Sequence, residues 1–198
     1  MFRFIYGVLV MTLMFNPASA IELSPQKLPQ PITTGGKPFM ETLAARKTER
    51  TFSKKDIDNQ TLSEILWSAW GISHDGKRTI PTSMNKQNLK VYVLKKDGVW
   101  LYKAENNTLE PINNKDMRHL FATQDFVKTA PLTLLYTGTD SKNSPLHAGS
   151  AYQNVGLYCA SKGLNNVVRG YFDHEQIEKA LNLAKEEKAI ISQTIGWK

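Results

Sequence analysis

The sequence has little cysteine and only one long apolar run. Cys159 is the single cysteine, so an intramolecular disulfide is excluded, and stability must come from a buried core or a partner subunit. Cys159 lies in the apolar stretch GLYCASKGL, which favours a small buried side chain over a catalytic thiol. After residue 20, no stretch approaches the roughly 18 apolar residues that a membrane-spanning helix needs. No membrane span is therefore expected in the rest of the chain.

Metal and hydrolase motifs are also missing. No spacing of His, Cys and Asp matches a metal-ligand pattern, so no metal is expected. No Gly-x-Ser-x-Gly turn surrounds Ser83, which would be the nucleophile of a hydrolase. A hydrolase is therefore disfavoured, although four histidines could act as its base: His74, His119, His147 and His174.

The chain has an excess of positive charge, with a formal net charge of +7. This balance suits an anionic small molecule, a membrane surface or nucleic acid. The cations are spread along the chain rather than gathered into long blocks, which argues against nucleic acid.

The first twenty residues have the pattern of a secretory signal. Arg3 supplies the positive start, Phe4 to Phe15 the apolar stretch, and Ala18-Ser19-Ala20 a small-residue cleavage site. We expect cleavage after Ala20 and an exported protein, either periplasmic or secreted. Removal of residues 1–20 takes away Arg3 alone among the charged side chains, so the mature chain stays basic.

The mature chain divides into an arm and one domain. Residues 21–37 hold three prolines and two glycines with little periodicity, which predicts an extended N-terminal arm. Residues 38–198 are long enough for one domain with a sizeable core.

Apolar spacing predicts four helices. A short helix is expected over residues 38–47, and a second over 56–68 that ends near Gly71. A long helix over 148–162 should stop at Gly163. The last is expected over 174–184.

Strand signals are strongest in LKVYVLKKDGVWLYKA, where residues 89–94 and 99–104 flank Asp97-Gly98 and predict a hairpin. Residues 131–138, PLTLLYTG, form an apolar run typical of a central buried strand. Residues 189–196 predict a final strand. The fold class expected is therefore α+β, with a mixed central sheet flanked by helices.

The stretch ARKTERTF, residues 45–52, is called the basic segment here and raises the first functional question. Arg46, Lys47 and Arg50 surround Thr48 where a helix gives way to extended chain. A guanidinium can hold phosphate with two hydrogen bonds, and a hydroxyl or backbone N–H can complete the site. Taken alone, the cluster is also compatible with a solvated charged surface.

Two further stretches could contact a flat polar ligand. Residues 79–88, TIPTSMNKQN, are called the polar loop; Asn and Gln side chains match a heterocycle edge with alternating donors and acceptors. In GLNNVVRGYFD, residues 163–173, a loop between two helices is expected to let the backbone of Gly170 approach a ligand. Ordinary turn chemistry explains both stretches equally well.

The order of the motifs along the chain favours a ligand site over a solvated surface and ordinary turns. The basic segment, the polar loop before a hairpin, TAPLTLLYTG, AYQNVGLYCASKGL, VVRGYFD and a terminal IISQTIGW resemble the FMN-dependent nitroreductase superfamily over residues 39–197. This resemblance implies a nitroreductase-like fold in which a long central helix forms a homodimer. It also implies that each flavin site is built from both subunits.

The resemblance implies a set of FMN-binding residues. The basic segment would contact the flavin phosphate, ribityl chain and pyrimidine edge, while Arg169-Gly170 would meet flavin N5 through the backbone. The full set is Arg46, Lys47, Thr48, Arg50, Pro81, Thr82, Ser83, Asn85, Gln87, Arg169, Gly170 and Lys198. Lys198 is included because relatives carry basic residues to the phosphate on a C-terminal arm, whereas this sequence stops at Lys198. Residues 105–130 are short where larger relatives insert a lid, so an open pocket is expected.

The resemblance also implies an activity. An FMN-dependent oxidoreductase would pass hydride or electrons through flavin N5, from a small-molecule donor to a nitroaromatic, quinone or similar acceptor. No side-chain acid or base is demanded, although Arg46 or Lys47 would stabilise negative charge on the reduced ring. Two alternatives stay open: an exported flavin- or ligand-binding protein without turnover, and a flavin-dependent dehydrogenase that acts on a peptide-derived or other small substrate.

Overall fold

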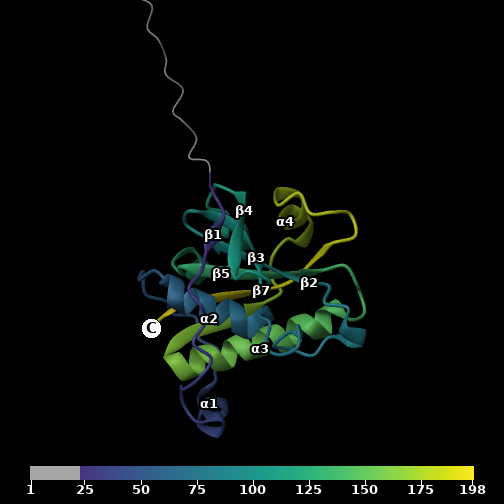
Figure 1. The fold of residues 1–198 in the computed structure, drawn as a ribbon. Helices are drawn as coiled ribbons and strands as arrows, with labels where there is room; N and C mark the ends of the chain where they lie inside the picture. Colours follow the sequence, from purple (N-terminus) through teal and green to yellow (C-terminus); the bar gives the residue numbers. More distant parts are fainter. Residues whose placement is uncertain (1–22) are drawn as a thin grey trace, which may run out of the picture.

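The computed structural model describes residues 23–198, and the predicted secretory signal lies outside the described residues. Within them the chain forms a seven-stranded sheet with helices on both faces (Figure 1). The strands are β1 (Gln26–Lys27), β2 (Leu89–Lys95), β3 (Gly98–Lys103), β4 (Thr108–Asn113), β5 (Leu132–Gly138), β6 (Leu164–Arg169) and β7 (Lys188–Trp197). The α-helices are α1 (Phe39–Ala45), α2 (Asn59–Trp70), α3 (Ser144–Lys162) and α4 (His174–Ala180). The predicted α+β class is confirmed.

The sheet has the strand order β1-β4-β3-β2-β5-β7-β6. Every strand pairing among the described residues is antiparallel, so the expected mixture of parallel and antiparallel pairs is wrong. Helix α3 connects β5 to β6, and these two strands run in the same direction. They are not neighbours, however, because β7 lies between them and is antiparallel to both.

The sheet separates two apolar cores. Helices α2 and α3 cover one face, while α4 and the two short 3-10 turns Arg118–Phe121 and Asp125–Lys128 cover the other. In β2, Val91 and Val93 enter the first core and Tyr92 and Leu94 the second. Because both faces are covered, β2 and β5 read as nearly continuous apolar runs.

Local signals fix the ends of the helices that carry the site. Asp58 caps α2 by accepting the backbone N–H of Thr61 at 2.8 Å. Gly163 ends α3 in a left-handed conformation with φ of 79°, which glycine adopts without steric cost. Helix α3 begins at Ser144, four residues before the predicted start, and α4 ends at Ala180, four residues before its predicted end.

The described part of the N-terminal arm is docked on the domain. Strand β1 pairs with β4, and Leu28 is buried. The Pro29 carbonyl accepts hydrogen bonds from Ser63 Oγ at 2.6 Å and from Asn107 Nδ2 at 2.7 Å. These bonds hold the arm against α2.

Two stretches contain strands that were not predicted from the sequence. The stretch 163–173 was predicted as a loop between helices, but its first part is β6, at the edge of the sheet. The stretch 105–130 contains β4. Among residues 23–198, no helix is both long and apolar enough to cross a bilayer.

Candidate functional site

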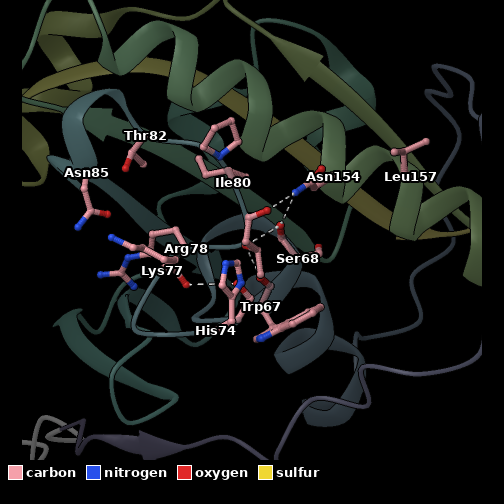
Figure 2. Close-up of a pocket in the computed structure, with 13 residues that line it drawn as sticks. Trp67, Ser68, His74, Lys77, Arg78, Ile80, Thr82, Asn85, Asn154 and Leu157 are labelled. Atoms are coloured by element: carbon pink, nitrogen blue, oxygen red, sulfur yellow. Dashed lines mark hydrogen bonds between the residues drawn. The ribbon is translucent and has the colours of Figure 1, made fainter.

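A pocket of about 730 Å³ lies between α2, α3 and the chain that joins α2 to β2 (Figure 2). Its size and mixed lining are typical of a small-molecule site. In Figure 2, Asn85 and Lys77 lie at one side and Leu157 at the other. The lining residues are Trp67, Ser68, Ser73, His74, Lys77, Arg78, Thr79, Ile80, Pro81, Thr82, Asn85, Asn154 and Leu157.

The polar loop supplies three of its predicted site residues, Pro81, Thr82 and Asn85, to this pocket. Gln87 does not line it, but its Nε2 donates to Asn85 Oδ1 at 3.1 Å and so orients that side chain. Ser83 contributes through its backbone, because its N–H donates to His147 Nε2 at 2.9 Å. The Ser83 hydroxyl takes no part in this bond, which gives no support to a serine–histidine hydrolase.

Arg78 was not predicted, and it shapes one wall of the pocket. Its guanidinium stacks on the Trp70 ring at 4.6 Å and bonds Glu105 at 2.7 Å. Its Nε donates to Gln87 Oε1 at 2.7 Å. Asn154 on α3, in the stretch AYQNVGLYCASKGL, was not predicted as a site residue either, yet it lines the pocket and donates to the Ser68 carbonyl at 3.2 Å.

The basic segment lies elsewhere, along the outer edge of β6. The Glu49 N–H donates to the Asn166 carbonyl at 3.0 Å, and Asn165 Nδ2 donates to the Thr51 carbonyl at 2.7 Å. These bonds attach the segment to an edge strand that would otherwise leave backbone groups unpaired. Arg46 packs near Gly156 of α3: a Cβ added at Gly156 would lie 3.8 Å from Arg46 Cδ.

The charges of the basic segment are mostly exposed. Lys47 pairs with Glu49, and these two residues line a small pocket of about 60 Å³ together with Lys198. The pKa of Glu49 is lowered by the hydrogen bond and charge of Lys47, and further by the charge of Lys198. Lys198 therefore lies close to Lys47 and Glu49, and its predicted contact with a phosphate stays a prediction. Thr48 and Arg50 are exposed.

Arg169 and Gly170 form the far end of this edge. The Arg169 side chain is buried and donates to the Phe121 carbonyl, Thr123 Oγ1, Gln124 Oε1 and the Tyr171 carbonyl. Burial, together with the charge of Arg50, lowers the pKa of Arg169. Because its N–H groups are committed to these partners, its part at the site is structural. Gly170 is exposed, as contact with a ligand through its backbone requires.

The predicted site residues therefore fall into two groups. No residue of the basic segment lines the large pocket, and no residue of the polar loop lines the small one. Cys159 is buried, and desolvation raises the pKa of its thiol, so it belongs to the core. Among residues 23–198, no three His, Cys, Asp or Glu side chains are grouped as a metal site.

A model of the Nitroreductase family matches residues 43–197, which is most of the chain. The chain belongs to the Nitroreductase family. This finding confirms the resemblance that the order of the motifs predicted. Membership in the Nitroreductase family supports an oxidoreductase. No curated protein sequence matches the chain significantly.

Solved structures agree with this assignment. A protein assigned as a nitroreductase from Ralstonia eutropha JMP134 is 34% identical with a TM-score of 0.84, and the match covers 95% of this chain and 96% of that one. Another such protein, from Anabaena variabilis ATCC 29413, is 18% identical with a TM-score of 0.74; the match covers 87% of this chain but 41% of that one. A chain of the Escherichia coli microcin synthetase McbBCD complex, with truncated pro-MccB17 bound, is 18% identical with a TM-score of 0.65. The match covers 98% of this chain and 84% of that one. The last two show the fold alone.

Proposed function

We propose that this member of the Nitroreductase family is an exported, FMN-dependent oxidoreductase that transfers electrons from a small-molecule donor to a nitroaromatic, quinone or similar acceptor. The observation that carries the proposal is the course of the basic segment along β6. It sets exposed cations beside one end of that strand and the exposed Gly170 just past the other.

The charges beside β6 and the length of this strand fit FMN. Lys47 and Lys198 line the small pocket together with one carboxylate, Glu49, and Arg46 directly precedes Lys47, so the summed charge of these three cations attracts a phosphate. Strand β6 has six residues and spans roughly 20 Å at about 3.3 Å per residue. An extended FMN has a comparable length, so its phosphate would lie near Lys47 and Lys198 and its ring near Gly170.

When bound, FMN would supply electron transfer through its N5 atom. The residues of the chain would bind and orient it. Arg50, whose charge acts on Arg169 next to Gly170, would stabilise negative charge on the reduced ring, and the backbone N–H of Gly170 would donate to the ring edge. Asn85, held by Gln87, would offer both a donor and an acceptor to the ribityl chain or the ring.

The separation of the two residue groups supports a homodimer with shared sites. Exposed apolar side chains gather near both ends of α3. Near its C-terminal end the arm and α1 expose Ile32, Phe39, Met40 and Leu43; near its N-terminal end the chain exposes Met84 and Leu146. Lys37 N–H donates to Ser161 Oγ at 2.9 Å, which fixes the arm before α1 at the C-terminal end of α3. Figure 1 shows α1 projecting from the rest of the domain.

A twofold dimer with antiparallel α3 helices would bring these two apolar groups together. The basic segment follows α1 directly, so it would reach the polar loop of the other chain. Each complete FMN site would then combine the basic segment of one protomer with the polar loop of its partner.

Mixing two variants tests this arrangement. Arg46→Ala and Asn85→Ala should each bind FMN weakly at a concentration that saturates the wild type. Co-expressed chains that pair at random should regain about a quarter of the wild-type sites, since only mixed dimers contain an intact site. A mixture that binds no more than its components would contradict shared sites. Lys185→Ala, which removes an exposed cation after α4, is the matched control.

Turnover is tested with FMN-loaded protein, using NADH or NADPH as donor and nitrofurazone or menadione as acceptor. Oxidation of the donor that depends on the acceptor would support the proposed activity. Retained FMN with no turnover by any pair would instead favour an exported flavin-binding protein.

A further inference from the structure

The polar loop has a strained backbone that must be held in place. Met84, Asn85 and Gln87 have φ of 49°, 54° and 42°, in the left-handed region that side chains other than glycine rarely adopt. Each such residue costs free energy and persists only where its surroundings fix it. Asn85 is a proposed ligand of FMN, so whatever fixes the loop also fixes the site.

His147 provides such a support from the first turn of α3. Its side chain is buried, with 4% of the residue exposed. Its Nε2 accepts the Ser83 N–H at 2.9 Å, and its Nδ1 lies 3.2 Å from Asn88 Oδ1. The ring therefore contacts the polar loop on both sides of the three strained residues.

The partners of His147 define its protonation state. A backbone N–H can only donate, so Nε2 must be an unprotonated acceptor. The proton of the neutral ring is then on Nδ1, which donates to Asn88 Oδ1. A protonated ring carries a hydrogen on both nitrogens, so Nε2–H would face Ser83 N–H and this hydrogen bond would be lost.

The charged groups on the segments around the ring are already paired. Lys86 in the polar loop pairs with Asp140, which precedes α3, at 3.9 Å. Lys90 on β2 pairs with the buried Glu187 at 2.5 Å. On the opposite side of the loop, Arg78 holds Gln87, and a guanidinium keeps its charge at all relevant pH values. Among these supports, His147 is the one whose hydrogen bonding to the loop depends on its protonation state.

We propose that His147 is a positioning residue that holds the polar loop in its binding shape while neutral and releases the loop when protonated. This inference deepens the proposed function, because it rests on the polar loop being part of the FMN site. It predicts that protonation of the His147 ring lowers the affinity for FMN.

Hydrogen exchange of the FMN-free mature protein tests the proposal directly. Protection of the Ser83 amide, corrected for intrinsic exchange rates, should fall about tenfold between pH 7.5 and pH 5.5, the order expected when a buried N–H loses its acceptor. His147→Gln keeps a non-titrating acceptor near the Nε2 position, so it should protect this amide equally at both pH values. His147→Leu should leave the amide unprotected at both. His119→Gln, which changes an exposed histidine, should behave as the wild type.

Equal protection in the wild type at both pH values would overturn the proposal, and this measurement needs no variant to fold. Protection of Ser83 in His147→Leu would also overturn it, provided that the amides of β5 show an intact sheet. The FMN dissociation constant should follow the same pattern with pH and variant. If FMN does not bind at all, the proposed function fails, whereas the exchange result still reports on His147.

Discussion

The guanidinium of Arg169 donates to the backbone carbonyl of Phe121 at 2.8 Å. This bond joins the end of β6 to the segment before β5, and the Phe126 ring packs over the same guanidinium at 5.3 Å. Gly170 follows Arg169 directly, so the turn proposed to meet the flavin ring is anchored by a buried charge.

Replacement of Arg169 should cost stability rather than only affinity. Arg169→Leu leaves the Phe121 carbonyl without its donor, and we expect the free energy of unfolding to fall by about 2–3 kcal/mol. Urea denaturation measures the loss. Arg50→Leu removes an exposed arginine nearby and should change stability by less than about 0.5 kcal/mol. Equal effects of the two changes would show that the buried network has no special role.

Loss of Arg46 should weaken FMN binding without unfolding the protein. A charge-assisted hydrogen bond to phosphate contributes roughly 1.5–3 kcal/mol, so Arg46→Ala should raise the dissociation constant between about 10-fold and 150-fold. Titration followed by flavin fluorescence measures this change, with Lys185→Ala as the control. An unchanged dissociation constant would mean that the basic segment is a solvated surface.

A charge on α3 should disrupt the proposed dimer. Leu146 has 67% of its surface exposed on one chain, and a carboxylate there would be buried without a partner if the chains pair as proposed. Leu146→Glu should therefore shift the mass at micromolar concentration from dimer to monomer in light scattering. Ile112→Glu, at an exposed apolar position on β4, is the matched control. A dimer that tolerates Leu146→Glu would contradict the arrangement.

Capping of α2 by Asp58 should be visible as a pH-dependent contribution to stability. The pKa of Asp58 lies below its ordinary value of 3.8, chiefly because its carboxylate accepts the backbone N–H of Thr61. A folded-state pKa that is lowered gives stability above the unfolded pKa, and this stability is lost as the pH falls through the folded pKa. Asp58→Ala should cost about 1 kcal/mol at pH 7 and progressively less below pH 4. Asp58→Asn keeps the acceptor and should show little pH dependence; urea unfolding of all three proteins checks this.

The fold was predictable where local signals were strong. The Asp97-Gly98 turn and the two β-rich runs beside it predicted the hairpin, and the apolar run 131–138 predicted β5. Strand β6 was missed because its sequence contains two polar residues in a row. Asn165 and Asn166 are buried in a strand because Thr51 and Gln193 provide their hydrogen-bond partners, which no local pattern reveals.

The site was only partly predictable. The order of the motifs indicated the basic segment and the polar loop, but periodicity does not show that they lie apart on one chain. Arg78 and His147 were missed as supports because their partners are distant in sequence: Glu105 is 27 residues from Arg78, and Ser83 is 64 from His147. Contacts between residues so far apart in the sequence form only when the sheet and its covering helices are folded.

The most direct test of the account is the visible absorption spectrum of the mature protein, residues 21–198, after incubation with excess FMN and desalting. The account predicts retained bands of oxidised flavin in a ratio of about one FMN per chain, since each site of a twofold dimer uses one basic segment and one polar loop. Protein that is colourless after desalting, and that shows no saturable quenching of FMN fluorescence in a titration, would contradict the proposal that this chain is an FMN-dependent enzyme.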